Sequence, residues 1–225
     1  MSKNAFQTIS TGVFDRAGRD TISERLFFGT LGAVLVYGFI MTAFIANSTA
    51  GMFAHGTNWL TVIMVGLVIP ILGIIIAVKS DNPFISFVGY NMVVVPFGVI
   101  LAPVLQQYSH DVIRNAFTIT AIDVITMSLL AVSFPKFFSK IGGALFFALL
   151  GLVVVRIVQL FVPALANLTI VDWISAAIFS LYVGFDWWRA NTVPKTFDNA
   201  VDLSLDLYLD IINLFLSILR ILGKK

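Results

Sequence analysis

The chain has no cysteine, only two histidines and few charged residues, which make up 12% of its 225 positions. Without cysteine there is no thiol chemistry, and the sequence gives no indication of the redox compartment. Soluble domains are about one quarter charged. The low charge, beside 59% hydrophobic residues, therefore indicates an integral membrane protein. A net charge of +2 gives no reason to expect a nucleic-acid partner.

Several enzyme classes are excluded because their reactive residues are missing. Zinc hydrolases need several histidine ligands, and here His55 and His110 both fall in predicted loops. A retinal protein needs a lysine inside its bundle, whereas every lysine lies in a predicted loop, span end or tail. No serine has a Gly-x-Ser-x-Gly setting. The sequence therefore predicts a protein that is not an enzyme and uses no cofactor.

Long apolar runs are abundant, each close to the roughly 20 residues of a spanning helix. They predict an all-α membrane protein with seven transmembrane helices in a single bundle. Residues 1–25 form a short arm before a transmembrane domain over 26–225. Pro70, Pro96 and Pro103 fall inside spans and predict kinks or local unwinding. The spans are expected at residues 26–46, 60–78, 84–106, 112–134, 141–161, 173–189 and 199–222.

Lysine and arginine in the loops set the predicted orientation. Nine of them lie in the N-terminal arm and the loops on its side of the membrane, against Arg114 alone on the other side. The N-terminus is therefore expected to be cytoplasmic and, after seven spans, the C-terminus outside. The basic tail, with Arg220, Lys224 and Lys225, runs against this rule. The lipid-facing runs lack GxxxG-like spacing, so a monomer is expected.

Ionisable residues inside the predicted spans are the main functional signal, because a charge in hydrocarbon is costly. Asp202, Asp206 and Asp210 are spaced four apart in the last span and share one helix face. Asp123, Arg156 and Asp186 lie in earlier spans. Carboxylates without histidine or a nucleophile suit two tasks: binding hard cations such as Ca²⁺, or exchanging protons as a coupled pair. The alternative is that they link helices, which is the favoured interpretation for Asp123 and Arg156.

Two segments near the C-terminus resemble motifs of a known family. LYLDIINLFLSILRILG, from residue 207 to 223, resembles the C-terminal signature of the Bax inhibitor-1 family. FSLYVGFD, from 179 to 186, resembles its sixth-helix motif. The resemblance implies a bundle whose last helix is central, and a calcium leak sensed by aspartates on the last two helices. These are Asp186 and Asp210, which would also bind calcium transiently. It also implies a bacterial type of member in the cytoplasmic membrane.

The resemblance therefore implies a pH-sensitive calcium leak channel with calcium ions, protons and membrane lipids as its partners. Two other functions stay open. One is a non-conducting regulator of membrane proteases or cell-death proteins, which would bind a membrane-protein partner. The other is a proton-coupled transporter, in which Asp123, Arg156 and the aspartates would line a substrate cavity. Bacterial members carry a basic residue on the second helix that pairs with the sixth-helix aspartate, and Lys79 is its nearest equivalent here.

The partner of Asp186 depends on where the last hairpin turns. A turn centred on residue 198 makes Asp210 level with Asp186. If Pro194 ends the sixth helix and Asp198 caps the seventh, the centre is nearer 196 and Asp206 becomes level instead. The choice moves the partner by about 6 Å. The family motif favours Asp210, which leaves Asp206 as an additional pathway residue.

Overall fold

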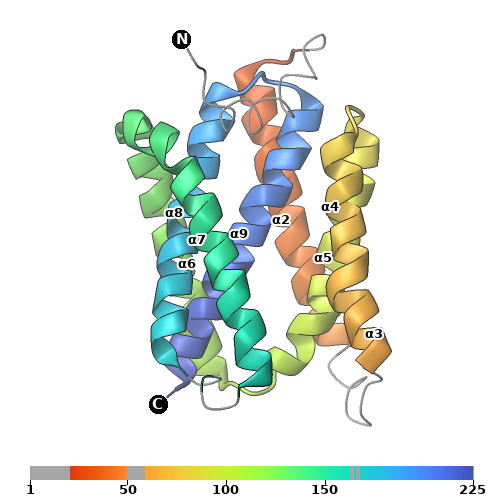
Figure 1. Ribbon diagram of the computed structural model, residues 1–225. Helices are drawn as coiled ribbons and strands as arrows, with labels where there is room; N and C mark the ends of the chain where they lie inside the picture. The colour runs from red at the N-terminus through yellow and green to blue at the C-terminus, as the bar shows by residue number, and fades with distance from the viewer. Residues whose placement is uncertain (1–20, 50–58, 163–164, 166–167, 225) are drawn as a thin grey trace. The chain divides into compact units, whose positions relative to one another are not determined.

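The computed structural model describes residues 21–49, 59–162, 165 and 168–224, and they are helical throughout apart from short connections. Helices cover all seven predicted spans, which confirms the all-α fold class. Most of the predicted arm, and His55, lie outside the described residues, while His110 begins a helix rather than lying in a loop. The helices (Figure 1) are α2 Glu24–Ser48, α3 Trp59–Ile63, π-helix η1 Met64–Val68, α4 Ile69–Lys79, α5 Pro83–Leu105, α6 His110–Ser133, α7 Pro135–Phe161, α8 Thr169–Thr192 and α9 Phe197–Gly223.

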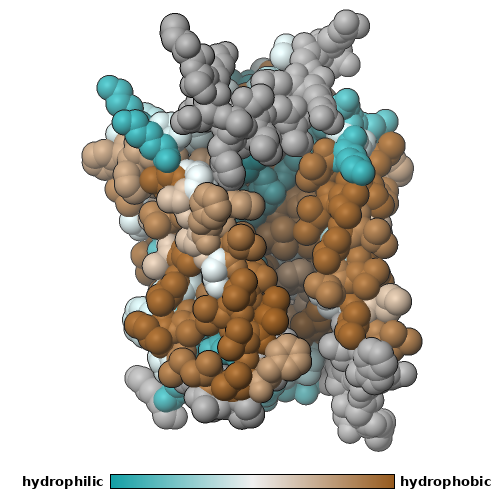
Figure 2. Space-filling model, in the orientation of Figure 1, coloured by the Kyte–Doolittle hydropathy of each residue, from teal (hydrophilic) through white to brown (hydrophobic). Residues whose placement is uncertain are grey.

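Five helices, α2, α5, α6, α7 and α8, are long and apolar enough to cross a membrane. Their outward-facing side chains are large and hydrophobic, including Phe44 on α2 and Phe147 on α7. Figure 2 shows hydrophobic residues gathered over α7 and over α4 on the visible face. In water such surfaces would be strongly unfavourable, so the chain is a multi-pass membrane protein, as predicted.

The described chain divides into two compact units, and α9 belongs to both. One unit, here unit 1, contains α2 to α5 and the start of α9 as far as Tyr208. The other, unit 2, contains α6, α7, α8 and α9 from Leu209 onward. Most residues of α9 are buried.

Unit 1 depends on a close approach of α4 and α5 at two glycines. A Cβ placed on Gly73 would lie 2.6 Å from the carbonyl oxygen of Gly89. One placed on Gly89 would lie 2.5 Å from the carbonyl oxygen of Gly73 and 2.9 Å from the backbone nitrogen of Ala77. Only hydrogen fits at either position, as is common where membrane helices pack backbone against backbone.

Pro70, in the first turn of α4, follows an irregular turn of the chain. Proline has no N–H to donate to the carbonyl one turn earlier, and residues Met64–Val68 form a π-helical turn immediately before it. The irregularity here is a wider helical turn, and the chain is not unwound. By contrast, α5 continues through Pro96 and Pro103 as an α-helix.

The start of α9 is fixed within unit 1 by hydroxyl groups. The N–H of Asn199 donates to Oγ1 of Thr196, so Thr196, and not Asp198, caps the helix. Ser204 Oγ donates to the carbonyl oxygen of Leu31 at 3.0 Å. The hydroxyls of Thr42 and Tyr208 lie 2.6 Å apart in the core. The loop before α9 is held too, with Lys195 Nζ 4.9 Å from the ring of Phe27.

In unit 2, glycines admit aromatic rings between helices. A Cβ on Gly142 of α7 would lie 2.8 Å from the ring of Phe185 on α8. Gly184 of α8 likewise faces the ring of Phe138 on α7, which is buried. These reciprocal contacts set the distance between α7 and α8.

We expect Gly89→Ala to lower the thermal unfolding temperature of the detergent-solubilised protein. The new methyl group forces α4 and α5 apart, at a cost of about 1–3 kcal/mol. Gly151→Ala on α7 is the matched control, since nothing lies within 4 Å of its Cβ position. Equal unfolding temperatures for the two variants would show that the glycine contact does not support the fold.

Candidate functional site

Asp186, the first of the predicted pair, is a buried acid on α8 with a cation on the same helix. Its side chain is 4% exposed, and Arg189 Nη1 donates to its Oδ1 at 2.8 Å. Residues three apart on a helix lie on the same face, so this ion pair is local. The Arg189 guanidinium also lies 5.7 Å from the centre of the Phe185 ring. The charge of Asp186 is thereby balanced inside the span.

Asp210, the second of the pair, is buried in the same unit on α9. Two contacts fix the register of α8 against this part of α9. Asp172 accepts a hydrogen bond from Arg220, and the hydroxyls of Ser175 and Ser217 lie 2.8 Å apart.

In both of these contacts the two partners are equally far along the chain from Thr196. The hairpin is therefore centred at residue 196, the second of the two centres considered above. Asp210 is displaced by four residues, about 6 Å, from the position level with Asp186.

Asp123 joins α6 to α8. Its Oδ1 accepts a hydrogen bond from Ser180 Oγ at 3.0 Å. Its Oδ2 is buried and has no hydrogen-bond partner among the residues that the structure describes. This contact agrees with the interpretation that Asp123 links helices.

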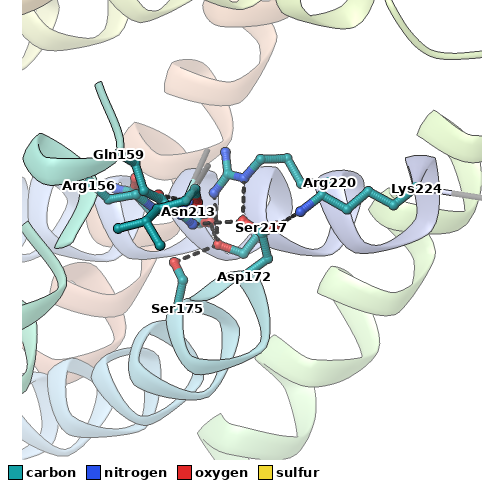
Figure 3. A network of polar contacts seen from close by, with 9 residues as sticks. Arg156, Gln159, Asp172, Ser175, Asn213, Ser217, Arg220 and Lys224 are labelled. Atoms are coloured by element: carbon teal, nitrogen blue, oxygen red, sulfur yellow. Dashed lines mark hydrogen bonds and ion pairs between the residues drawn. The ribbon is translucent and has the colours of Figure 1, made fainter. Parts of the chain in front are cut away.

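The most highly connected acid of unit 2 is Asp172, in the first turn of α8. It is almost fully buried, and it accepts from three cations that come from two other helices (Figure 3). Arg156 Nη2 of α7 and Arg220 Nε of α9 lie 2.7 and 2.8 Å from its Oδ1. Lys224 Nζ lies 2.8 Å from Oδ2. One carboxylate therefore holds the ends of α7, α8 and the chain after α9 together.

The contacts extend from this ion cluster into uncharged groups. Arg156 Nη1 donates to Gln159 Oε1 at 3.1 Å, and Arg220 Nη2 donates to Ser217 Oγ at 3.3 Å. Arg156 and Arg220 also line a cavity of about 510 Å³ in unit 2. Arg156, predicted as a pathway residue, thus combines a helix-linking role with a position on a cavity wall.

The remaining predicted residues lie in unit 1. Lys79 is exposed at the end of α4. Asp206 lies on the first part of α9 and is half-buried. Nearby on α9, Asp198 accepts from Ser86 Oγ of α5 at 2.8 Å. Within the described ranges, no group of three or more acidic or histidine side chains is arranged to hold a metal ion.

Sequence reasoning missed Asp172 and Arg189. Arg189 carried a readable signal, since its spacing of three from Asp186 places the two on one helix face. For Asp172, the available signal was the basic tail, whose positive charges needed an acidic partner. Arg220 and Lys224 ran against the positive-inside rule, and the structure gives both of them an acidic partner.

Taken together, the helices and their buried charges define an α-helical multi-pass membrane protein with ionisable groups inside its spans. A family model described as "Inhibitor of apoptosis-promoting Bax1" matches residues 25–225. The chain therefore belongs to the Bax inhibitor-1 family, as its two C-terminal motifs predicted.

Similar proteins occur in several bacteria. The inner membrane protein YbhL of Escherichia coli (strain K12) is 27% identical, over 93% of this chain and 94% of its own length. An uncharacterized protein of Helicobacter pylori is 31% identical over 142 residues, or 63% of this chain, and the match spans 61% of that protein. An uncharacterized membrane protein of Streptococcus pyogenes serotype M3, SpyM3_0260, is 32% identical over 57% of this chain and 58% of its own.

We expect Asp172→Asn to destabilise the protein, because three cations then lack their shared carboxylate. Breaking a fully buried ion pair costs about 3–5 kcal/mol. The cations here are about one third exposed, so a smaller loss of about 1–3 kcal/mol is expected. The measurement is the thermal unfolding temperature in a zwitterionic detergent.

Asp111→Asn is the matched control for Asp172→Asn. Asp111 pairs with Arg114 at 3.1 Å, but both side chains are at least three-quarters exposed. Surface pairs of this kind contribute about 0–1 kcal/mol, so the unfolding temperature should hardly change. If Asp172→Asn were as mild as Asp111→Asn, the ion cluster would have no structural importance.

Proposed function

We propose that this protein is a calcium leak channel of the bacterial cytoplasmic membrane, and that protonation of Asp186 and Asp210 closes it. With one shared proton, the two acids hydrogen-bond and hold the last two helices in a closed arrangement. When that proton is lost, two like charges in a poorly hydrated place repel each other, or a cation enters between them. Acid therefore favours the closed state, and neutral or higher pH favours the open state.

The observation that carries the proposal is the burial of both acids within one unit. Asp186 and Asp210 are only 3% and 8% exposed, and they lie on α8 and α9 in the same compact unit. Intramembrane acids are functional by default, since an apolar residue would be more stable at these positions. Carboxylate oxygens are also the ligands that Ca²⁺ prefers.

The Asp186–Arg189 ion pair adds a competitor to this mechanism. Arg189 occupies Oδ1 of Asp186, so a proton or a calcium ion must compete with the guanidinium for that carboxylate. The stagger of about 6 Å along the helices means that a shared proton requires α9 to slide or tilt against α8. Closure in this proposal is therefore a movement of helices as well as a titration.

The other predicted residues have subsidiary roles in the proposal. Asp206, Asp123, Arg156 and Lys79 lie along or beside the pathway without being the sensor. Calcium ions, protons and membrane lipids are the partners, with the protein acting as a monomer. The predicted orientation places the N-terminus in the cytoplasm and the C-terminus outside. The similarity to an inner membrane protein of Escherichia coli supports the cytoplasmic membrane as its location.

The direct test is calcium flux into liposomes that contain only the purified protein, measured from pH 5 to pH 8. For the wild type we expect flux to rise with pH. Asp186→Asn and Asp210→Asn should each give low flux at every pH, because an asparagine amide imitates the shared proton. A bias of about 1.4 kcal/mol toward the closed state lowers flux about tenfold.

Asp111→Asn controls for the charge change in this test, because Asp111 is exposed on α6. Asp206→Asn tests the other candidate partner of Asp186, and its calcium flux is compared with that of Asp210→Asn. Unchanged flux in both Asp186→Asn and Asp210→Asn would overturn the proposed sensor. No flux from folded wild-type protein at any pH would favour a non-conducting regulator, and flux that depends on a proton gradient would favour a transporter.

Arg189→Gln should move the pH of half-maximal flux upward by about one unit, because an acid without its neighbouring cation binds a proton more readily. The conservative variant Arg189→Lys keeps the charge and should stay close to the wild-type midpoint. The same flux assay measures both variants. A midpoint that is unchanged in Arg189→Gln would exclude Arg189 as a competitor for Asp186.

A further inference from the structure

The cavity of unit 2 combines an apolar wall with two guanidinium groups. Leu149, Leu152, Val153 and Ile157 of α7 form much of its apolar lining, while Arg156 and Arg220 supply charge. Its volume of about 510 Å³ is within the range of small-molecule sites. This cavity is distinct from the proposed pH sensor, since neither Asp186 nor Asp210 lines it.

The two guanidiniums that line this cavity share one carboxylate. Arg156 and Arg220 carry two positive charges, and both pair with Asp172, which supplies one negative charge. These three side chains together have a net charge of +1. Asp172 is almost fully buried, whereas each cation is about one third exposed. A ligand approaching from outside therefore meets the cations and not the carboxylate.

The guanidinium groups also have hydrogen-bond donors to spare. A guanidinium has five N–H donors in a planar fork. Arg220 uses Nε for Asp172 and Nη2 for Ser217. Its Nη1 has no hydrogen-bond partner among the described residues. Forked N–H groups of this kind suit the oxygen atoms of a phosphate.

The apolar part of the cavity meets the surface that faces lipid. Val153 and Ile157 line the cavity and are still 45% and 50% exposed. On the same helix, Leu150 and Val154 are exposed apolar side chains. An acyl chain can therefore lie along α7 while its charged headgroup reaches the guanidiniums. A free inorganic anion would gain nothing from this apolar wall.

We propose that the cavity of unit 2 binds an anionic membrane phospholipid, with the lipid phosphate at Arg156 and Arg220 and an acyl chain along α7. Basic pockets between transmembrane helices are suited to anionic headgroups. Asp172 has a specific part in this site: it competes with the lipid phosphate for the guanidiniums from α7 and α9.

The test is titration of the detergent-solubilised protein with phosphatidylglycerol, followed by native mass spectrometry, with phosphatidylcholine as the zwitterionic comparison. We expect the wild type to prefer phosphatidylglycerol. The double variant Arg156→Gln/Arg220→Gln should bind it at least about tenfold more weakly, since it loses charge-assisted hydrogen bonds. Arg114→Gln is the matched control, because it removes a cation of unit 2 whose side chain is 75% exposed.

Asp172→Asn separates a lipid site from a merely structural cluster. It removes the competing carboxylate and keeps all three cations, so phosphatidylglycerol should bind more tightly and raise the unfolding temperature more than in wild type. A structural cluster alone predicts no gain in lipid binding for this variant. Tighter phosphatidylglycerol binding in Asp172→Asn therefore supports the lipid site, and unchanged or weaker binding contradicts it. This comparison holds even if the double arginine variant fails to fold.

Three further results would overturn the proposal. The first is equal binding of the two lipids by the wild type. The second is an equal loss of phosphatidylglycerol binding in Arg114→Gln and in the double variant, which would indicate general surface attraction. The third is displacement of the lipid by millimolar inorganic phosphate, which would identify a site for free anions. Lipid binding is measured without calcium flux, so a negative result for the lipid site is distinguishable from a negative result for the proposed channel.

Discussion

A carboxylate loses most of its hydration when it enters a membrane, and only a nearby cation, hydroxyl or backbone donor compensates for the loss. The acids of this chain follow that constraint. Asp172 is held by three cations and Asp186 by Arg189. Asp123 and Asp198 accept from serine hydroxyls. Because these partners come from different helices in three of the four cases, neutralising the acids also fixes which helices lie together.

The same constraint separates structural acids from functional ones. Asp172 has more cationic partners than it needs, and it lies where three helices end, so its main effect is on assembly. Asp186 is paired with a cation of its own helix, so this ion pair by itself does not join two helices. A buried acid in a membrane span is costly and is a candidate for ion or proton exchange. This contrast supports the proposed gate at Asp186 and Asp210.

The helices were predictable because hydrophobic length is a strong signal. The observed ends lie within four residues of the predicted spans, except that α7 begins at Pro135, six residues before the predicted start at 141. Asp123, Asp186 and Asp210 were also predictable, since each stands out against an apolar background, whereas Asp172 was missed. The partners of these buried acids were not predictable. Which residue meets Asp172 depends on the register between α8 and α9, and Thr196 rather than Asp198 begins α9. Local spacing could have identified Arg189, but no local rule links Asp172 to Arg220 and Lys224. Similarly, the sequence located a disturbance at Pro70 without showing that it takes the form of a π-helical turn.

The sharing of α9 between the two units has a consequence for biogenesis. Tyr208 is part of the core of unit 1, and Leu214 and Leu219 are buried in unit 2. Since α9 follows all the other described helices along the chain, neither unit has its complete core when the earlier helices leave the ribosome. Synthesis of the last helix therefore completes both units at once, and a ribosome that stalls before α9 leaves two unfinished cores in the membrane for quality-control proteases.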